Sequence, residues 1–326
     1  MPFLDDLKRY GPRPDQSRAA VSRAEAWAYC DHLTRAHYEN FSVVTWLTPK
    51  PLRPAFQSIY AFCRWSDDLG DEVGDPARST ELLAWWRGEL HALFAGEAPR
   101  HPVMIALGEI VREFAIPIDP FEALIAAFEQ DQVVTEYATY NDLLDYCTRS
   151  ANPVGHLVLY LGRVFNPENA RLADLTCTGL QLANFWQDVA RDLTIGRIYL
   201  PVEDRERFGY RDADLRDRRF TPKFAALLSF EVERARDLLR SGRALLDRLP
   251  QGLAVDVDLF GRGGMAILDR IEAQEFDVWR SRPEVGKVAK LALLARAVWS
   301  RAWPSRFGGP ARARTVTADP ILGRAS

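Results

Sequence analysis

Two clusters of aspartates have the residue type and spacing that metal-assisted chemistry requires. The first comprises Asp67, Asp68 and Asp71, and the second comprises Asp188 and Asp192. Carboxylate oxygens are the protein ligands that Mg²⁺ prefers, usually a few of them, with water and phosphate oxygens completing the shell. Two such clusters facing each other across a cavity would form an oxygen-only site for magnesium. A calcium-binding EF-hand is a poor fit, because its loop spacing and its final glutamate are absent.

Each cluster belongs to a longer polar stripe on an expected helix. A helix turns by about 100° per residue, so positions three and four apart share a face. The first stripe comprises Tyr60, Arg64, Asp67 and Asp71, with Asp68 at its edge; the second comprises Gln181, Asn184, Asp188 and Asp192. Solvent exposure with compensating arginines is the simpler explanation for a single acidic stripe. Both stripes, however, continue into uncharged polar or aromatic residues within apolar segments, which favours an internal site.

The segments that position these stripes are expected to be helical. Apolar residues recur at helical spacing in 79–94, 120–135, 172–193, 224–249 and 265–278. Pro- and Gly-containing breakers separate these segments, and no alternating pattern is long enough for a sheet. We therefore predict an all-α fold with one domain over residues 1–303, a helical bundle around a central cavity. Residues 304–326, rich in Pro, Gly, Ala and Arg, are expected to be a flexible tail.

Bulk composition limits the other classes of function. The chain of 326 residues has a net charge of -3, which provides no electrostatic case for nucleic acid or an anionic membrane as partner. Its four cysteines form no CxxC pair, which argues against a zinc site or a disulfide framework. No signal peptide and no apolar run of membrane-spanning length is present. We expect a cytoplasmic protein whose membrane contact, if any, is peripheral to the inner membrane.

The motifs of both stripes resemble those of the squalene/phytoene synthase family. YxxCRxxDDxxD begins at Tyr60, QxxNxxxDxxxD begins at Gln181, and the match extends from about His37 to about Ile271. The resemblance implies an isoprenoid-synthase fold, a prenyl diphosphate substrate, and Mg²⁺ held by the aspartates. It also implies that Arg64 contacts phosphate, that Gln181 and Asn184 orient the diphosphate, and that Tyr60 stabilises a carbocation or relays a proton.

Two further segments extend the resemblance. The stretch from His37 to Ser42 is similar to the family's HxxSFS motif, which implies that His37 approaches a diphosphate and that Phe41 lines the substrate tunnel. A partly buried histidine with a structural role is the simpler explanation for His37 alone. The stretch from Tyr146 to Gly155 is similar to the family's YCxxVAGxVG segment, which implies a catalytic role for Tyr146 like that of Tyr60.

Departures from the family pattern indicate which branch the chain resembles. Ser150, Asn152 and Pro153 replace an apolar wall, and we expect the proline to bend a helix and Asn152 to contact the substrate or hold water. Gly264 stands where many relatives have a tyrosine, although it may equally allow close helix packing or begin a helix. The pattern most resembles hydroxysqualene synthase of bacterial hopanoid biosynthesis. That resemblance implies presqualene diphosphate as substrate, capture of the cation by water, and neighbouring hopanoid-pathway enzymes as partners.

Two alternatives remain open. One is a different head-to-head synthase, either a presqualene diphosphate synthase or a complete squalene synthase that condenses two farnesyl diphosphates. The other is a non-catalytic helical protein that binds lipids or assembles enzymes, for which loss of one acidic stripe would be the expected sign; both stripes are intact.

Overall fold

The fold consists of helices only. The computed structural model describes residues 2–12, 21–36 and 48–286, and no strand occurs among them. The helices of the first half are α1 (Pro2–Tyr10), α2 (Arg23–Ala36), the 3-10 helix η1 (Lys50–Leu52), α5 (Arg53–Asp71), α6 (Pro76–Phe94), α7 (Pro102–Phe114) and α8 (Asp119–Gln130). Those of the second half are α9 (Tyr140–Ser150), α10 (Asn152–Leu161), α11 (Pro167–Thr194), α12 (Val202–Arg207), α13 (Asp212–Arg216), α14 (Pro222–Gly242), η2 (Arg243–Arg248) and α15 (Gln251–Ala273). The all-α prediction is confirmed.

Capping residues explain where several helices begin. Asp75, Asn166 and Thr221 each accept a hydrogen bond from a backbone N–H of the helix that follows, and each is followed by proline. A proline at this position costs nothing, because the first N–H groups of a helix have no partner within it. Thr139 forms a complete capping box with Asp142 at the start of α9. Local sequence therefore determines the first turns of the long helices.

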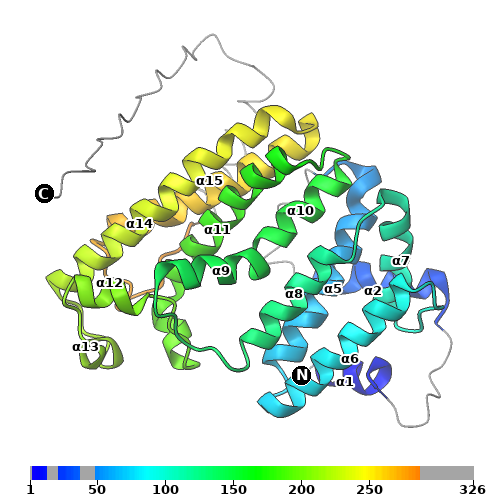
Figure 1. Ribbon diagram of the computed structural model, residues 1–326, viewed down its shortest axis with the longest axis horizontal. Helices are drawn as coiled ribbons and strands as arrows, with labels where there is room; N and C mark the ends of the chain where they lie inside the picture. Colours follow the sequence, from blue (N-terminus) through cyan, green and yellow to red (C-terminus); the bar gives the residue numbers. More distant parts are fainter. Residues whose placement is uncertain (1, 13–20, 37–47, 287–326) are drawn as a thin grey trace, which may run out of the picture.

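The helices pack in two neighbouring groups, with α5 in the first and α11 in the second (Figure 1). Helices α2, α5, α6, α7 and α8 surround one hydrophobic core, in which Trp65 and Trp86 stack with 5.6 Å between ring centroids. Helices α9, α11, α14 and α15 enclose a second core. Helix α11 runs along both α14 and α15, and α10 packs against it from the other side. The two aspartate helices, α5 and α11, thus belong to different cores.

Two helix boundaries differ from the predictions. The segment 224–249 is not one helix: α14 ends at Gly242, where an added Cβ would lie 2.3 Å from the Thr176 hydroxyl, and the chain continues as η2. The predicted helix 265–278 begins earlier and ends sooner, because α15 runs from Gln251 to Ala273. The predicted break at Pro250 is present between η2 and α15, and Gly252 lies in the first turn of α15, where an added Cβ would be 2.6 Å from Pro49.

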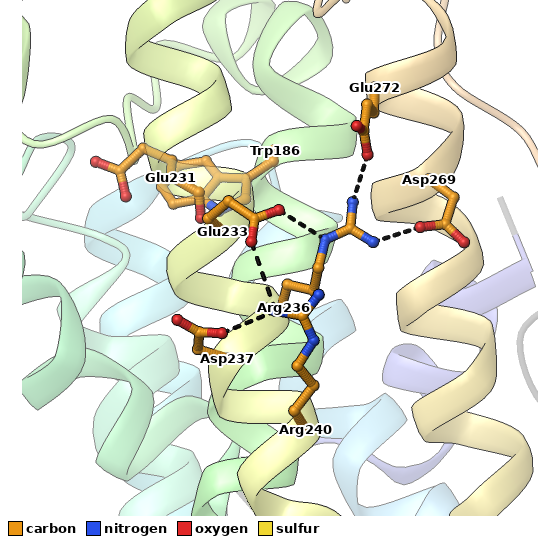
Figure 2. Close-up of polar contacts among 8 residues, drawn as sticks. All are labelled: Trp186, Glu231, Glu233, Arg236, Asp237, Arg240, Asp269 and Glu272. Atoms are coloured by element: carbon orange, nitrogen blue, oxygen red, sulfur yellow. Dashed lines mark hydrogen bonds and ion pairs between the residues drawn. The ribbon is translucent and has the colours of Figure 1, made fainter. Parts of the chain in front are cut away.

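A buried arginine joins α14 to α15 (Figure 2). The guanidinium of Arg236 donates to Glu233 at 2.9 Å, to Glu272 at 2.8 Å and to Asp269, and its side chain is 7% exposed. Three carboxylates therefore compensate one desolvated cation, which is the condition under which a buried charge is tolerated.

Arg236→Ala should lower the free energy of unfolding by roughly 1–3 kcal/mol, because it removes both the charge contacts and the packing of the buried stem. Arg240→Ala, one turn further on the exposed face of α14, is the matched control and should cost less than about 1 kcal/mol. Urea unfolding measures both values, and equal losses in the two variants would contradict the interpretation.

A buried acid on α14 should make stability depend on pH. Glu231 is fully buried, and burial together with its hydrogen bond to Asp204 raises its pKa to about 8 from 4.5. Between these values the folded protein holds a proton that the unfolded chain releases, so stability falls as pH rises from about 4.5 to about 8. The maximum slope for one such group is about 1.4 kcal/mol per pH unit.

Glu231→Gln should therefore flatten the decline in melting temperature across this range. Thermal unfolding of the wild type and the variant at several pH values provides the comparison, with the exposed Glu97→Gln as control. A decline as steep in Glu231→Gln as in the wild type would exclude Glu231 as its source.

Candidate active site

The first stripe lies on the C-terminal half of α5, with its polar side chains in mutual contact. Arg64 donates to Asp67 at 3.1 Å and also to Asp68, whose side chain is 4% exposed. Asp67 is partly exposed and Asp71 is exposed, whereas Tyr60 is half-buried one turn before Arg64. The carboxylates of Asp67, Asp68 and Asp71 thus lie in the last turns of α5, and that of Asp68 is directed inward to Arg64.

The second stripe lies along the C-terminal half of α11. Gln181 is half-buried, Asn184 is exposed, and Asp188 is buried at 5% exposure, with Asp192 partly exposed one turn further. Arg282, after α15, donates to both oxygens of Asp188 at 2.5 and 3.1 Å. This arginine was not recognised in the sequence, because it lies almost a hundred positions from its partner and outside any motif.

Arg197 links the two stripes. Its guanidinium donates to Asp71 on α5 at 2.8 Å, and its charge opposes the rise that burial causes in the pKa of Asp67 and in that of Asp192 on α11. Arg197 therefore lies within electrostatic reach of acids on both α5 and α11. The contact of Arg197 with acids of both clusters was not predicted from the sequence.

A further acid, Asp131, belongs to the same polar region. It follows α8, and it accepts a hydrogen bond from the Tyr146 hydroxyl at 2.9 Å. Burial raises its pKa to about 6, the positive charge of Arg197 opposes that shift, and Asp71 adds to it. Tyr146 is buried in an aromatic group with Tyr199 and Phe185. The sequence signal for Asp131, an acid at the end of an apolar helix, was present but too general to assign.

The acids of the site carry more negative charge than their arginines neutralise. Burial is the main cause that raises the pKa of Asp67 to about 6 and those of Asp68 and Asp192 to about 7; the neighbouring Asp71 adds to the shift of Asp67, and Asp188 to that of Asp192. Oxygen ligands with excess charge suit a hard divalent cation. Within residues 2–12, 21–36 and 48–286, no three acidic, His or Cys side chains converge closely enough to hold a metal ion by themselves.

An apolar cavity of about 410 Å³ adjoins this polar region. Its wall comes from α5, α10, α11, η2 and α15, and includes Tyr60, one turn before Arg64, and Leu180, directly before Gln181. The cavity thus begins at the N-terminal end of each polar stripe, at Tyr60 on α5 and next to Gln181 on α11. Asp256 is the one carboxylic acid among its described lining residues, and burial raises the pKa of Asp256 to about 7. The volume lies within the usual range for small-molecule sites.

The segment that departs from the family pattern, around Ser150, Asn152 and Pro153, separates two helices and does not bend a single one. Ala151, with φ -125°, separates α9 from α10, and Pro153 occupies the first turn of α10. The predicted bend within one helix is therefore wrong, because a proline is tolerated at a helix start. Asn152 is buried and accepts a hydrogen bond from Thr178 at 2.9 Å. The buried hydroxyl oxygen of Ser150 has no hydrogen-bond partner among the described residues.

Gly264 permits close helix packing. A Cβ at this position would lie 2.7 Å from a methyl group of Leu180 and 3.1 Å from one of Leu239, so a tyrosine does not fit without rearrangement. Gly264 lies inside α15, so the alternative that it begins a helix is wrong. His37 and Phe41, the two remaining candidates, lie outside the described residues.

The sequence predicts no membrane-spanning segment, and the helices of the structure can be compared with that prediction. None of the helices in the described part of the chain combines the length and the apolar character needed to cross a bilayer.

Comparisons with known proteins agree with this arrangement. The family model for squalene/phytoene synthase matches residues 34–289. The 15-cis-phytoene synthase of Synechocystis is 33% identical, over 89% of this chain and 90% of that protein, and the presqualene diphosphate synthase of Rhodopseudomonas palustris is 29% identical over 76% and 88%. The crystal structure of squalene synthase HpnC from Alicyclobacillus acidocaldarius is 45% identical and superposes with a TM-score of 0.75, covering 79% of this chain and 97% of that one. The chain belongs to the squalene/phytoene synthase family.

Proposed function

We propose that this chain is a hydroxysqualene synthase, which converts presqualene diphosphate and water to hydroxysqualene and diphosphate. The class of substrate rests on the apolar cavity that adjoins the two aspartate clusters. A prenyl diphosphate has the same two parts, a long hydrocarbon and a highly charged head. The identity of 45% with squalene synthase HpnC supports this branch over phytoene formation.

The chemistry begins with departure of the diphosphate. Asp67, Asp71, Asp188 and Asp192 would hold Mg²⁺, which neutralises the charge that develops on the leaving group. Arg64, which is partly buried and paired with Asp67, would donate to the phosphate oxygens from the α5 side. Charge stabilisation by preorganised groups is usually the largest contribution to catalysis.

Arg197 and Arg282 are each bound to an acid of one cluster. Their positive charges offset part of the negative charge of these acids before the substrate enters. Both guanidinium groups lie where a diphosphate would replace the acids as their hydrogen-bond partner. The apolar wall of the cavity next to Tyr60 then excludes bulk water from the carbocation that remains after the diphosphate leaves.

The observation that carries the choice of product is the polar break between α9 and α10. Buried polar groups almost always have partners, so the unpartnered hydroxyl of Ser150 calls for a ligand. Ser150 is close in sequence to Val154 and Gly155, which line the cavity. It also lies two residues before Asn152, which is hydrogen-bonded to Thr178. We infer that this group holds the water that adds to the cation, with its proton passing to the departed diphosphate.

Purified protein incubated with presqualene diphosphate and Mg²⁺ should form hydroxysqualene whether or not NADPH is present. Ser150→Val should still release diphosphate but should shift the products from the alcohol toward hydrocarbons. Formation of squalene only with NADPH, or activity on farnesyl diphosphate alone, would reject the proposal. The second outcome would favour presqualene diphosphate synthase, the activity named for the Rhodopseudomonas relative.

A further inference from the structure

One buried acid of the apolar cavity has no role in the reaction proposed above. Asp256, on α15, is 4% exposed and lines the cavity. Neither of its carboxyl oxygens has a hydrogen-bond partner among the described residues. Burial raises the pKa of Asp256 to about 7; the Thr48 side chain opposes that rise, but it does not reach hydrogen-bonding geometry with either oxygen. Buried polar groups almost always have partners, so this carboxyl group calls for a ligand.

A second acid of α15 shows how a buried carboxylate is compensated when its role is structural. Asp258 is 2% exposed, and it accepts hydrogen bonds from Arg262 at 2.8 Å and from Arg243 at 3.2 Å. No lysine or arginine of the described chain contributes to the pKa of Asp256. An acid that is buried without a partner lowers stability, so its presence beside a compensated acid indicates a binding role.

Asp256 lies at the end of the cavity that is remote from the aspartate clusters. One turn before it, an added Cβ at Gly252 would be 2.6 Å from Pro49, which precedes α5, whereas the acids of α5 lie at the other end of that helix. Gly264 is the part of α15 that meets Leu180, at the start of the second polar stripe. Asp256 lies about 12 Å away from Gly264 along the helix axis.

A neutral hydroxyl group is the chemical partner that suits this place. A carboxylic acid can donate one hydrogen bond and accept another, as a hydroxyl group can. A phosphate would lack a compensating cation there, and a hydrocarbon end would leave the acid unpartnered. We propose that the cavity binds a long-chain or isoprenoid alcohol, with its hydroxyl group on Asp256 and its hydrocarbon along the apolar wall. Such an alcohol would exclude the hydrocarbon of a prenyl diphosphate and so act as a competitive inhibitor.

Isothermal titration calorimetry with 1-decanol tests this proposal in EDTA and without any diphosphate, and so independently of the proposed reaction. The matched ligand is methyl nonyl ether, which has the same number of heavy atoms but no hydroxyl group. Wild-type protein should bind the alcohol more tightly than the ether by about tenfold or more, because only the alcohol can exchange two hydrogen bonds with the buried acid.

Variants of the cavity wall locate the hydroxyl group. Asp256→Leu should bind both ligands with affinities within about threefold of each other, and its melting temperature should not fall, because an uncompensated acid is removed. Asp256→Asn, which keeps the size and the hydrogen-bonding groups, should retain most of the preference for the alcohol. Val257→Ala, on the same wall, should weaken both ligands equally and leave the preference unchanged. Tyr60→Phe should also keep the preference, because it changes the opposite end of the cavity.

Three results would overturn the proposal: wild-type protein that binds the two ligands equally or binds neither, an Asp256→Leu variant that still prefers the alcohol by the wild-type factor, or a preference that is lost in Tyr60→Phe.

Discussion

Replacing Asp67 or Asp188 by alanine should reduce turnover of the prenyl diphosphate by about 10³-fold or more, with only a small change in melting temperature. Each substitution removes an oxygen ligand from one side of the shared site, and charge stabilisation of a leaving group is the contribution that such sites provide. The fold should persist, because Asp67 is partly exposed and its partner Arg64 keeps the contact with Asp68. Release of inorganic diphosphate measures turnover.

Asp237→Ala provides the control for this experiment. Asp237 is an exposed acid on α14 that pairs with Arg240 (Figure 2), so its loss changes the same charge far from the site. It should retain nearly full turnover. If Asp67→Ala or Asp188→Ala were as active as Asp237→Ala, the aspartate clusters would not be the catalytic site.

Arg197→Met should lower kcat/KM by about 100-fold or more, the second largest effect that we expect. The guanidinium acts on Asp71, Asp67 and Asp192 together, and a neutral side chain would leave those carboxylates to repel one another and the incoming diphosphate. Arg197→Lys should restore only part of the activity, because an ammonium provides the charge without the planar bidentate geometry.

Arg191→Met distinguishes this role from a general effect of charge. Arg191 is exposed near the end of α11 and also lowers the pKa of Asp192, but it has no recorded contact with α5. Its replacement should change kcat/KM by less than about threefold, consistent with an exposed charge. Equal losses at both positions would show that Arg197 acts only through the overall charge of the region.

The spacing of polar residues along each helix explains which parts of the site were predictable. Spacings of three and four residues place side chains on one face of a helix, so both polar stripes and their helices followed from the sequence. That the two stripes face each other stays a prediction, supported by one cation that acts on acids of both. That cation is Arg197, which comes from the turn after α11.

Contacts between distant segments were not predictable in the same way. The bond from Arg282 to Asp188 and the place of Asp131 beside Tyr146 depend on how α8, α11 and the segment after α15 meet in space. No periodicity within one helix contains that information. The same limit explains the error at Pro153, where proline in the interior of a helix and proline in its first turn look alike in sequence until the preceding helix is seen to end at Ser150.

Binding of inorganic diphosphate tests the central claim most directly, namely that the two aspartate clusters together hold Mg²⁺ and a diphosphate. Isothermal titration calorimetry of the wild-type protein should show binding with Mg²⁺ present and none after EDTA is added. Asp67→Ala and Asp188→Ala should each lose the Mg²⁺-dependent binding, whereas Asp237→Ala should keep it. Equal binding with and without Mg²⁺, or unchanged binding when either cluster is disrupted, would contradict the account.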